Sequence, residues 1–84
     1  MKPIRFTRHA LERLPERGAT EDEVIRAVRE GLRELVREGR YRCRLNLQYR
    51  ALWQGRHYEI KQVAPVIVDQ DDAIVVVTVY TFYY

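Results

Sequence analysis

With 84 residues and 46% apolar content, the chain is expected to form one globular domain spanning residues 1–84 and not to be intrinsically disordered. The single cysteine, Cys43, excludes an internal disulfide. The sequence shows no apolar leader, and no apolar run approaches the roughly 20 residues of a membrane span. We therefore expect a cytoplasmic protein without membrane association. The net charge of +3 comes from 15 basic residues, 13 of them arginine, which fits a phosphate-rich partner and equally a GC-rich genome.

The first predicted helix runs from Arg8 towards Arg17. Thr7 is a good N-cap, because its hydroxyl can accept a hydrogen bond from a free amide of the first turn. Pro15 has no N–H to donate and its ring crowds the carbonyl four residues back, so we expect the last turn to be kinked or separately formed. Gly18 is a natural stop for this helix.

A second helix is predicted to begin after Thr20. The segment TEDE is a capping box, in which Thr20 and Glu23 each bond the backbone amide of the other. Apolar residues between Val24 and Val36 recur at helical spacing, and this pattern alone carries the helix to Gly39. Gly31 is the competing end signal, because a glycine inside a helix costs about 1 kcal/mol.

The period then changes from helical to alternating. From Tyr41 to Trp53 the odd positions are apolar and the even ones mostly Arg, Asn or Gln, which is typical of a strand with one buried face. The run is long, so we expect a bend or bulge near 46–48. The next strand contains Pro65, which predicts an edge or a bulge. The last strand, 73–84, is apolar on both faces and therefore central or covered. Helices followed by an antiparallel sheet indicate an α+β fold.

Three motifs carry a family resemblance. The chain contains a His-Ala-x-x-Arg-x-x-x-Arg-Gly opening at 9–18, a Thr-x-x-Glu-Val segment at 20–24 and a Val-Thr-Val-Tyr strand at 77–80. It resembles a small bacterial family of domains of unknown function (DUF4258-like), which is distantly similar to the RelE-like and colicin-like ribonuclease superfold. The resemblance implies two N-terminal helices packed on a four-stranded, mostly antiparallel sheet. It also implies a second helix that ends near Gly31, with Leu35 and Val36 already extended.

His9, Arg13 and Arg17 form the candidate catalytic group. Residues four apart lie about 40° apart around a helix, so the trio borders the apolar face. As a site, His9 is a general base near neutral pH and the arginines hold a phosphate, which suits metal-independent RNA cleavage by the ribose 2′-hydroxyl. Tyr80 and His57 are candidates for the second acid/base group. As structure, His9 instead hydrogen-bonds a neighbouring strand and the arginines pair with nearby acids. Both interpretations stay open.

Four arginines on the even face of the long strand form the candidate nucleic-acid site: Arg40, Arg42, Arg44 and Arg50. On a strand such residues are spaced by about 6.6 Å or its multiples, which suits a track for a nucleic-acid backbone. The alternative is a solvated face that prevents edge pairing.

The C-terminal strand predicts an interface. Tyr80, Phe82 and Tyr84 share one of its faces, and exposed aromatics of this kind favour a homodimer, unless the second helix covers them. No nucleotide-binding motif is present, and Cys43 and the two histidines lack metal-ligand spacing, so neither cofactor nor metal is expected.

Three functional classes follow from these observations. The first is a toxin-like, metal-independent endoribonuclease, and the second is a non-catalytic module that binds RNA or a cognate protein partner. The third is a small structural protein that acts as a homodimer. The sequence leaves open whether the protein is an enzyme.

Overall fold

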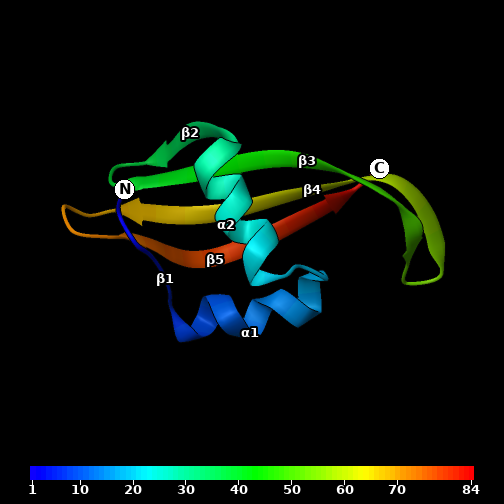
Figure 1. The fold of residues 1–84 in the computed structure, drawn as a ribbon. Helices are drawn as coiled ribbons and strands as arrows, with labels where there is room; N and C mark the ends of the chain where they lie inside the picture. Colours follow the sequence, from blue (N-terminus) through cyan, green and yellow to red (C-terminus); the bar gives the residue numbers. More distant parts are fainter.

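The computed structural model describes residues 1–84 as a five-stranded sheet with two helices (Figure 1). The strands are β1 (Ile4–Phe6), β2 (Leu32–Arg37), β3 (Arg40–Trp53), β4 (Arg56–Asp69) and β5 (Ile74–Tyr83). Their order across the sheet is β1-β5-β4-β3-β2. The α+β class is confirmed. The prediction of four strands is wrong, because the sheet has five. The sheet is mixed, because β1 pairs with β5 in parallel while the other pairings are antiparallel.

The additional strand is β1, which pairs in parallel with the start of β5, from Ile4 opposite Ile74 to Phe6 opposite Val76. A three-residue strand is too short to show an alternating pattern, so the local sequence does not predict it. It covers only the first residues of β5. The remainder of that side of β5 is left for α1 (Figure 1).

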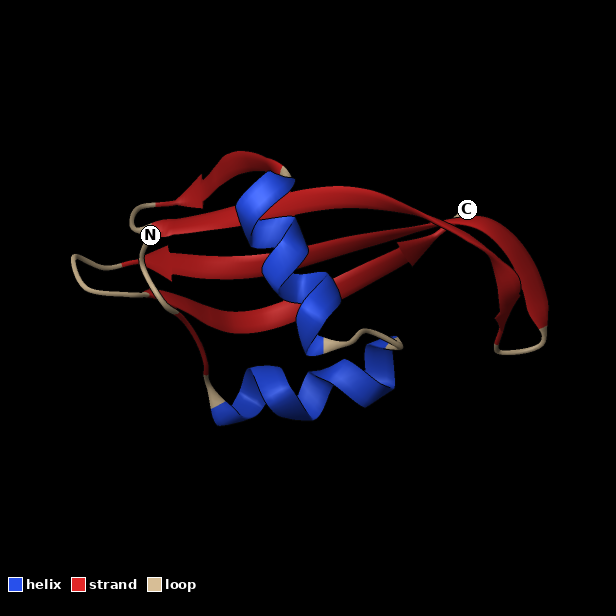
Figure 2. Ribbon diagram, in the orientation of Figure 1, coloured by secondary structure: helices blue, strands red, loops and turns tan.

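Helix α1 spans Arg8–Arg17 and has the predicted ends. The Thr7 side chain accepts a hydrogen bond from the Ala10 amide, and Gly18 ends the helix in the left-handed conformation at φ 71°. Pro15 lies inside the helix and does not divide it. In Figure 2 the last turn departs from the axis of the preceding part, as expected where proline removes a hydrogen bond.

Helix α2 spans Glu21–Glu30 and begins with the predicted capping box between Thr20 and Glu23. It ends at Gly31, so the extension to Gly39 from periodicity is wrong, and the residues after Gly31 form β2. A Cβ on Gly31 would lie 2.5 Å from the Ala27 carbonyl oxygen and 2.6 Å from that of Arg44. Glycine is therefore required by the close approach of α2 to β3, which sequence periodicity does not report.

Strands β3 and β4 form a long antiparallel hairpin whose register shifts between Gln48 and Ala51. The expected bulge therefore lies slightly later than residues 46–48, and Arg50 within it has φ 47°. Pro65 lies in β4, between β3 and β5, so an edge position is wrong. The β4–β5 register shifts beside it, between Val66 and Ile67, as the alternative of a bulge predicted.

The helices cover one face of the sheet only. Helix α2 crosses that face over β3 and β4, while α1 runs along β5 (Figures 1 and 2). The buried side chains beneath them include Val24, Cys43, Val63 and Ile67, so Cys43 belongs to the core as its alternation indicates. The opposite face carries no helix, and we call it the open face.

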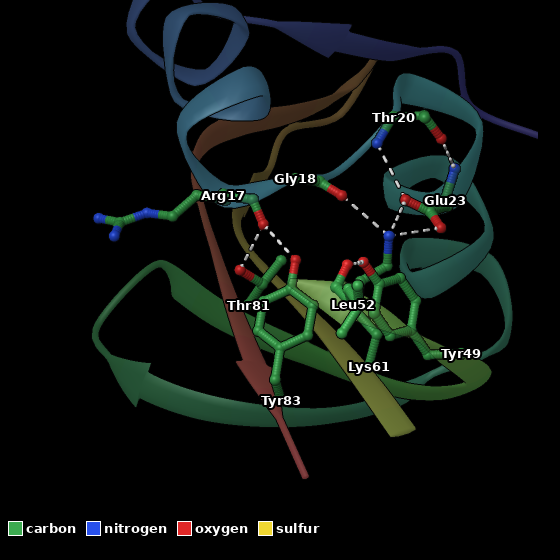
Figure 3. Close-up of polar contacts among 9 residues, drawn as sticks. All are labelled: Arg17, Gly18, Thr20, Glu23, Tyr49, Leu52, Lys61, Thr81 and Tyr83. Atoms are coloured by element: carbon green, nitrogen blue, oxygen red, sulfur yellow. Dashed lines mark hydrogen bonds and ion pairs between the residues drawn. The ribbon is translucent and has the colours of Figure 1, made fainter. Parts of the chain in front are cut away.

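A polar network joins the α1–α2 junction to the sheet (Figure 3). The Lys61 ammonium is almost fully buried and donates to the Gly18 carbonyl and to the Glu23 carboxylate, each at 2.9 Å. The Arg17 carbonyl accepts from the hydroxyls of Thr81 at 2.8 Å and Tyr83 at 2.7 Å. The donors and acceptors of this network are thus paired with one another, and β5 is held against the end of α1.

Candidate functional site

The candidate site is built on the open face along β5. Side chains that point to this face are fixed by register: Thr78, Tyr80 and Phe82 on β5 stand opposite Val66, Ala64 and Gln62 on β4. Helix α1 borders this row because β1 covers only the first part of β5. The site therefore combines one helix edge with one strand face.

His9 lies where α1 meets this row. Its Nε2 atom is 3.2 Å from the Thr78 hydroxyl oxygen, and its side chain remains exposed. The contact matches the structural interpretation, in which His9 hydrogen-bonds a neighbouring strand. It also leaves the imidazole at the rim of the open face, where a ligand can reach it.

The two arginines of the helix row differ in their partners. Arg13 pairs with Glu16 on the next turn, with 3.2 Å between Nη1 and Oε2. Arg17 makes no ion pair, and its guanidinium carbon lies 5.6 Å from the centre of the Tyr80 ring. In Figure 3 the Arg17 side chain points away from the hydrogen bonds of its own carbonyl. The Nε atoms of both arginines are buried without a partner in the protein, which is an uncommon arrangement.

Tyr80 completes the predicted catalytic set and is 41% exposed. It lies two residues beyond Thr78 on the same strand face, or about 6.6–6.8 Å along β5. His9, Arg17 and Tyr80 thus border one stretch of the open face, while Arg13 projects from the intervening turn of α1. Sequence reasoning gave Thr78 no role, although alternation with Tyr80 in the closing strand motif could have placed it on this face.

The arginine stripe of β3 borders the other side of the open face. Arg40 and Arg42 stand opposite Val68 and Val66, and Arg44 continues the same alternation. Arg50 lies past the alternation, in the bulge, where it pairs with Glu59 at 3.4 Å. The stripe is therefore three arginines long rather than four.

An acidic residue of β2 bridges two arginines of the stripe. The Glu34 Oε1 atom accepts from Nε of Arg42 at 3.1 Å and of Arg44 at 2.7 Å. These hydrogen bonds, from Arg44 first and Arg42 second, hold the pKa of the Glu34 carboxyl below its ordinary value. Arg40 and the neighbouring Arg37 make no ion pair, so their charges are uncompensated.

A cavity of about 440 Å³ opens between these two borders. Its eight lining residues are Val36, Arg37, Arg40, Arg42, Val66, Thr78, Tyr80 and Phe82. The lining contains three arginines and no acidic side chain, and its volume falls within the range of small-ligand pockets, roughly 300–1,000 Å³. Such a pocket suits an anionic ligand that also has apolar or aromatic surface.

The remaining candidates lie elsewhere. His57 is on the β3–β4 hairpin, where its Nδ1 atom is 4.0 Å from Glu59, and it does not reach the cavity. No group of three or more His, Cys, Asp or Glu side chains is arranged to hold a metal ion. No helix is long and apolar enough to cross a membrane.

The fold and this site define a small α+β domain with helices on one face of a sheet and an arginine-bordered cavity on the other. The chain belongs to the family described as Domain of unknown function (DUF4258), whose model matches residues 6–81. The matched range contains both helices and most of β5. No curated protein matches the chain. No solved structure matches it either.

Proposed function

We propose that this domain is a cytoplasmic RNA-binding protein whose ligand lies on the open face. The cavity between Tyr80 and the arginine stripe carries this proposal, because it joins exposed aromatic surface to uncompensated positive charge. RNA has the complementary chemistry, with anionic phosphates at regular intervals and flat bases between them.

The experiment is RNA binding as a function of salt, measured by fluorescence anisotropy of a labelled oligonucleotide. Arg40→Ala removes one phosphate contact, so the slope of log K against log salt should fall by roughly 0.7–0.9. Arg26→Ala is the matched control, because it removes the same charge from α2, where Arg26 pairs with Glu30. Equal effects of the two substitutions, or no binding by the wild type, would contradict the proposal.

Metal-independent RNA cleavage is the second candidate function. It is favoured by the position of His9 beside Thr78, which lies two residues before Tyr80 on the same strand face. In this reaction His9 takes the proton of the ribose 2′-hydroxyl as the 2′-oxygen attacks phosphorus. The bond from phosphorus to the 5′-oxygen breaks, the Tyr80 hydroxyl supplies the proton to that oxygen, and a 2′,3′-cyclic phosphate remains. Arg13 and Arg17 stabilise the charge that develops on the phosphate. The resemblance to RelE-like and colicin-like ribonucleases that the sequence motifs imply would also favour RNA cleavage.

Cleavage is tested by incubating labelled RNA with the protein and separating the products. His9→Ala should abolish cleavage and change the free energy of unfolding by no more than about 1 kcal/mol. A wild-type protein that leaves both structured and unstructured RNA intact would eliminate this candidate but not RNA binding. If His9→Ala unfolds the protein, the histidine is structural.

A further inference from the structure

Two aromatic rings lie side by side on the open face without a covering element. Tyr80 is 41% and Phe82 is 37% exposed, and the residues opposite them on β4 are Ala64 and Gln62. Neither α1 nor α2 covers them, contrary to the alternative expected from sequence. Because they are two residues apart on one strand face, their attachment points are about 6.6–6.8 Å apart.

Each ring is accompanied by an arginine from a different element. The guanidinium carbon of Arg17, on α1, lies 5.6 Å from the centre of the Tyr80 ring, and that of Arg44, on β3, lies 5.7 Å from the centre of the Phe82 ring. Guanidinium groups stack on flat π systems and also bind phosphate. The pair of rings is therefore bordered by a guanidinium on each side: that of Arg17 makes no ion pair, and that of Arg44 pairs with Glu34.

This face is poorly suited to a second copy of the chain. In a two-fold dimer the same patch meets itself, so the interface would contain both copies of Arg37, Arg40 and Arg42. Like charges brought together in an interface are unfavourable. A polyanion with flat, apolar groups meets no such opposition.

We infer that Tyr80 and Phe82 form a platform on which two successive unpaired bases of single-stranded RNA stack. This inference rests on the proposed RNA binding and names the form of RNA that the site accepts. The phosphates of the two nucleotides that carry these bases face Arg40 and Arg42 across the cavity. A duplex keeps its bases stacked inside the helix and cannot offer them to the two rings.

The test compares a labelled single-stranded oligonucleotide with a duplex of the same composition, again by anisotropy. Tyr80→Leu and Phe82→Leu keep an apolar side chain but remove the ring, and each should weaken single-strand binding by about 5-fold or more while leaving the salt slope unchanged. Tyr84→Leu is the control, because Tyr84 is exposed but lies outside the cavity. Tyr80→Phe keeps the ring and should therefore bind single-stranded RNA more tightly than Tyr80→Leu does.

A second measurement needs only the wild-type protein. The fluorescent base 2-aminopurine, placed in the single strand, should be quenched when it stacks on a ring.

The outcomes of these experiments separate the platform from the proposed function. Binding that depends on Arg40 but is unaffected by the leucine variants, or that is equal for both forms of RNA, would overturn the platform and leave the proposed function standing. Absence of any binding would instead defeat the proposed function. Light scattering that shows a dimer undisturbed by RNA would also overturn the platform, if Tyr80→Leu dissociates that dimer.

Discussion

Substitution of Gly18 by alanine tests how the α1–α2 junction is held against the sheet. A Cβ at this position would lie 2.5 Å from Trp53 Cζ3, 2.7 Å from its Cη2 atom and 2.6 Å from the Tyr83 hydroxyl oxygen. The Trp53 ring is stacked on Tyr83 at 5.0 Å between centroids, so it cannot move away alone. Crowding of this kind costs about 1–3 kcal/mol. The left-handed backbone at φ 71° adds about 1–2 kcal/mol for any residue with a Cβ.

Gly39→Ala is the matched control, because Gly39 has φ 76° but a Cβ added there would meet no atom within 4 Å. It should lose only the backbone contribution, about 1–2 kcal/mol, against about 2–5 kcal/mol for Gly18→Ala. Each kcal/mol lowers Tm by about 4–8 °C in a domain of this size. Urea unfolding followed by the fluorescence of Trp53, the single tryptophan, measures both changes. Equal destabilisation of the two variants would refute the packing of Trp53 on the junction.

The other predictions concern charge and burial. Glu34→Gln should strengthen RNA binding at low salt, because its carboxylate no longer competes with phosphate for Arg42 and Arg44; weaker binding in anisotropy would show that Glu34 orients them instead. The pKa of Glu34 is lower in the folded protein than its unfolded value of about 4.3. The stability that the ionised carboxylate contributes is therefore present above about pH 4.3 and is lost as the pH falls through the folded pKa. On acidification the urea midpoint of Glu34→Gln should consequently decrease less than that of the wild type. Burial raises the pKa of the Cys43 thiol, so a thiol reagent should react with it slowly until denaturant unfolds the protein; rapid reaction of the native protein would contradict this.

The helix starts could be predicted because their signals are local. Thr7 and Thr20 bond amides three residues away, and the residue types at those positions are sufficient to recognise the caps. The parallel strand β1 could not be predicted, because Ile4 finds its partner at Ile74, far along the chain. The end of α2 is also set at a distance, since the backbone of Arg44 leaves no room for a side chain on Gly31.

The candidate site was predictable in part for the same reason. Helical spacing placed His9, Arg13 and Arg17 in one row, and strand alternation placed Arg40, Arg42 and Arg44 in another. That both rows border one face depends on how α1 packs along β5, which no local pattern contains. The bulge that removes Arg50 from the stripe follows from a register shift against β4, and the alternation itself continues past it in the sequence.

Arg17 has two roles that can be separated: its carbonyl accepts hydrogen bonds that hold the sheet, and its guanidinium lies at the open face. Its carbonyl holds Thr81 and Tyr83 on the helix-covered side, while its guanidinium lies by Tyr80 on the other side. Arg17→Ala removes the side chain beyond Cβ, including the guanidinium, and leaves the carbonyl in place, so it should weaken RNA binding and cost about 0.5–1 kcal/mol of stability. Tyr83→Phe removes one hydrogen bond to the carbonyl, costing about 1 kcal/mol, and should leave RNA binding unchanged. If both variants lost binding in proportion to stability, binding would depend on the integrity of the fold and not on this guanidinium. If Arg17→Ala weakened RNA binding while Tyr83→Phe, at a similar loss of stability, did not, the arginine would be in direct contact with RNA.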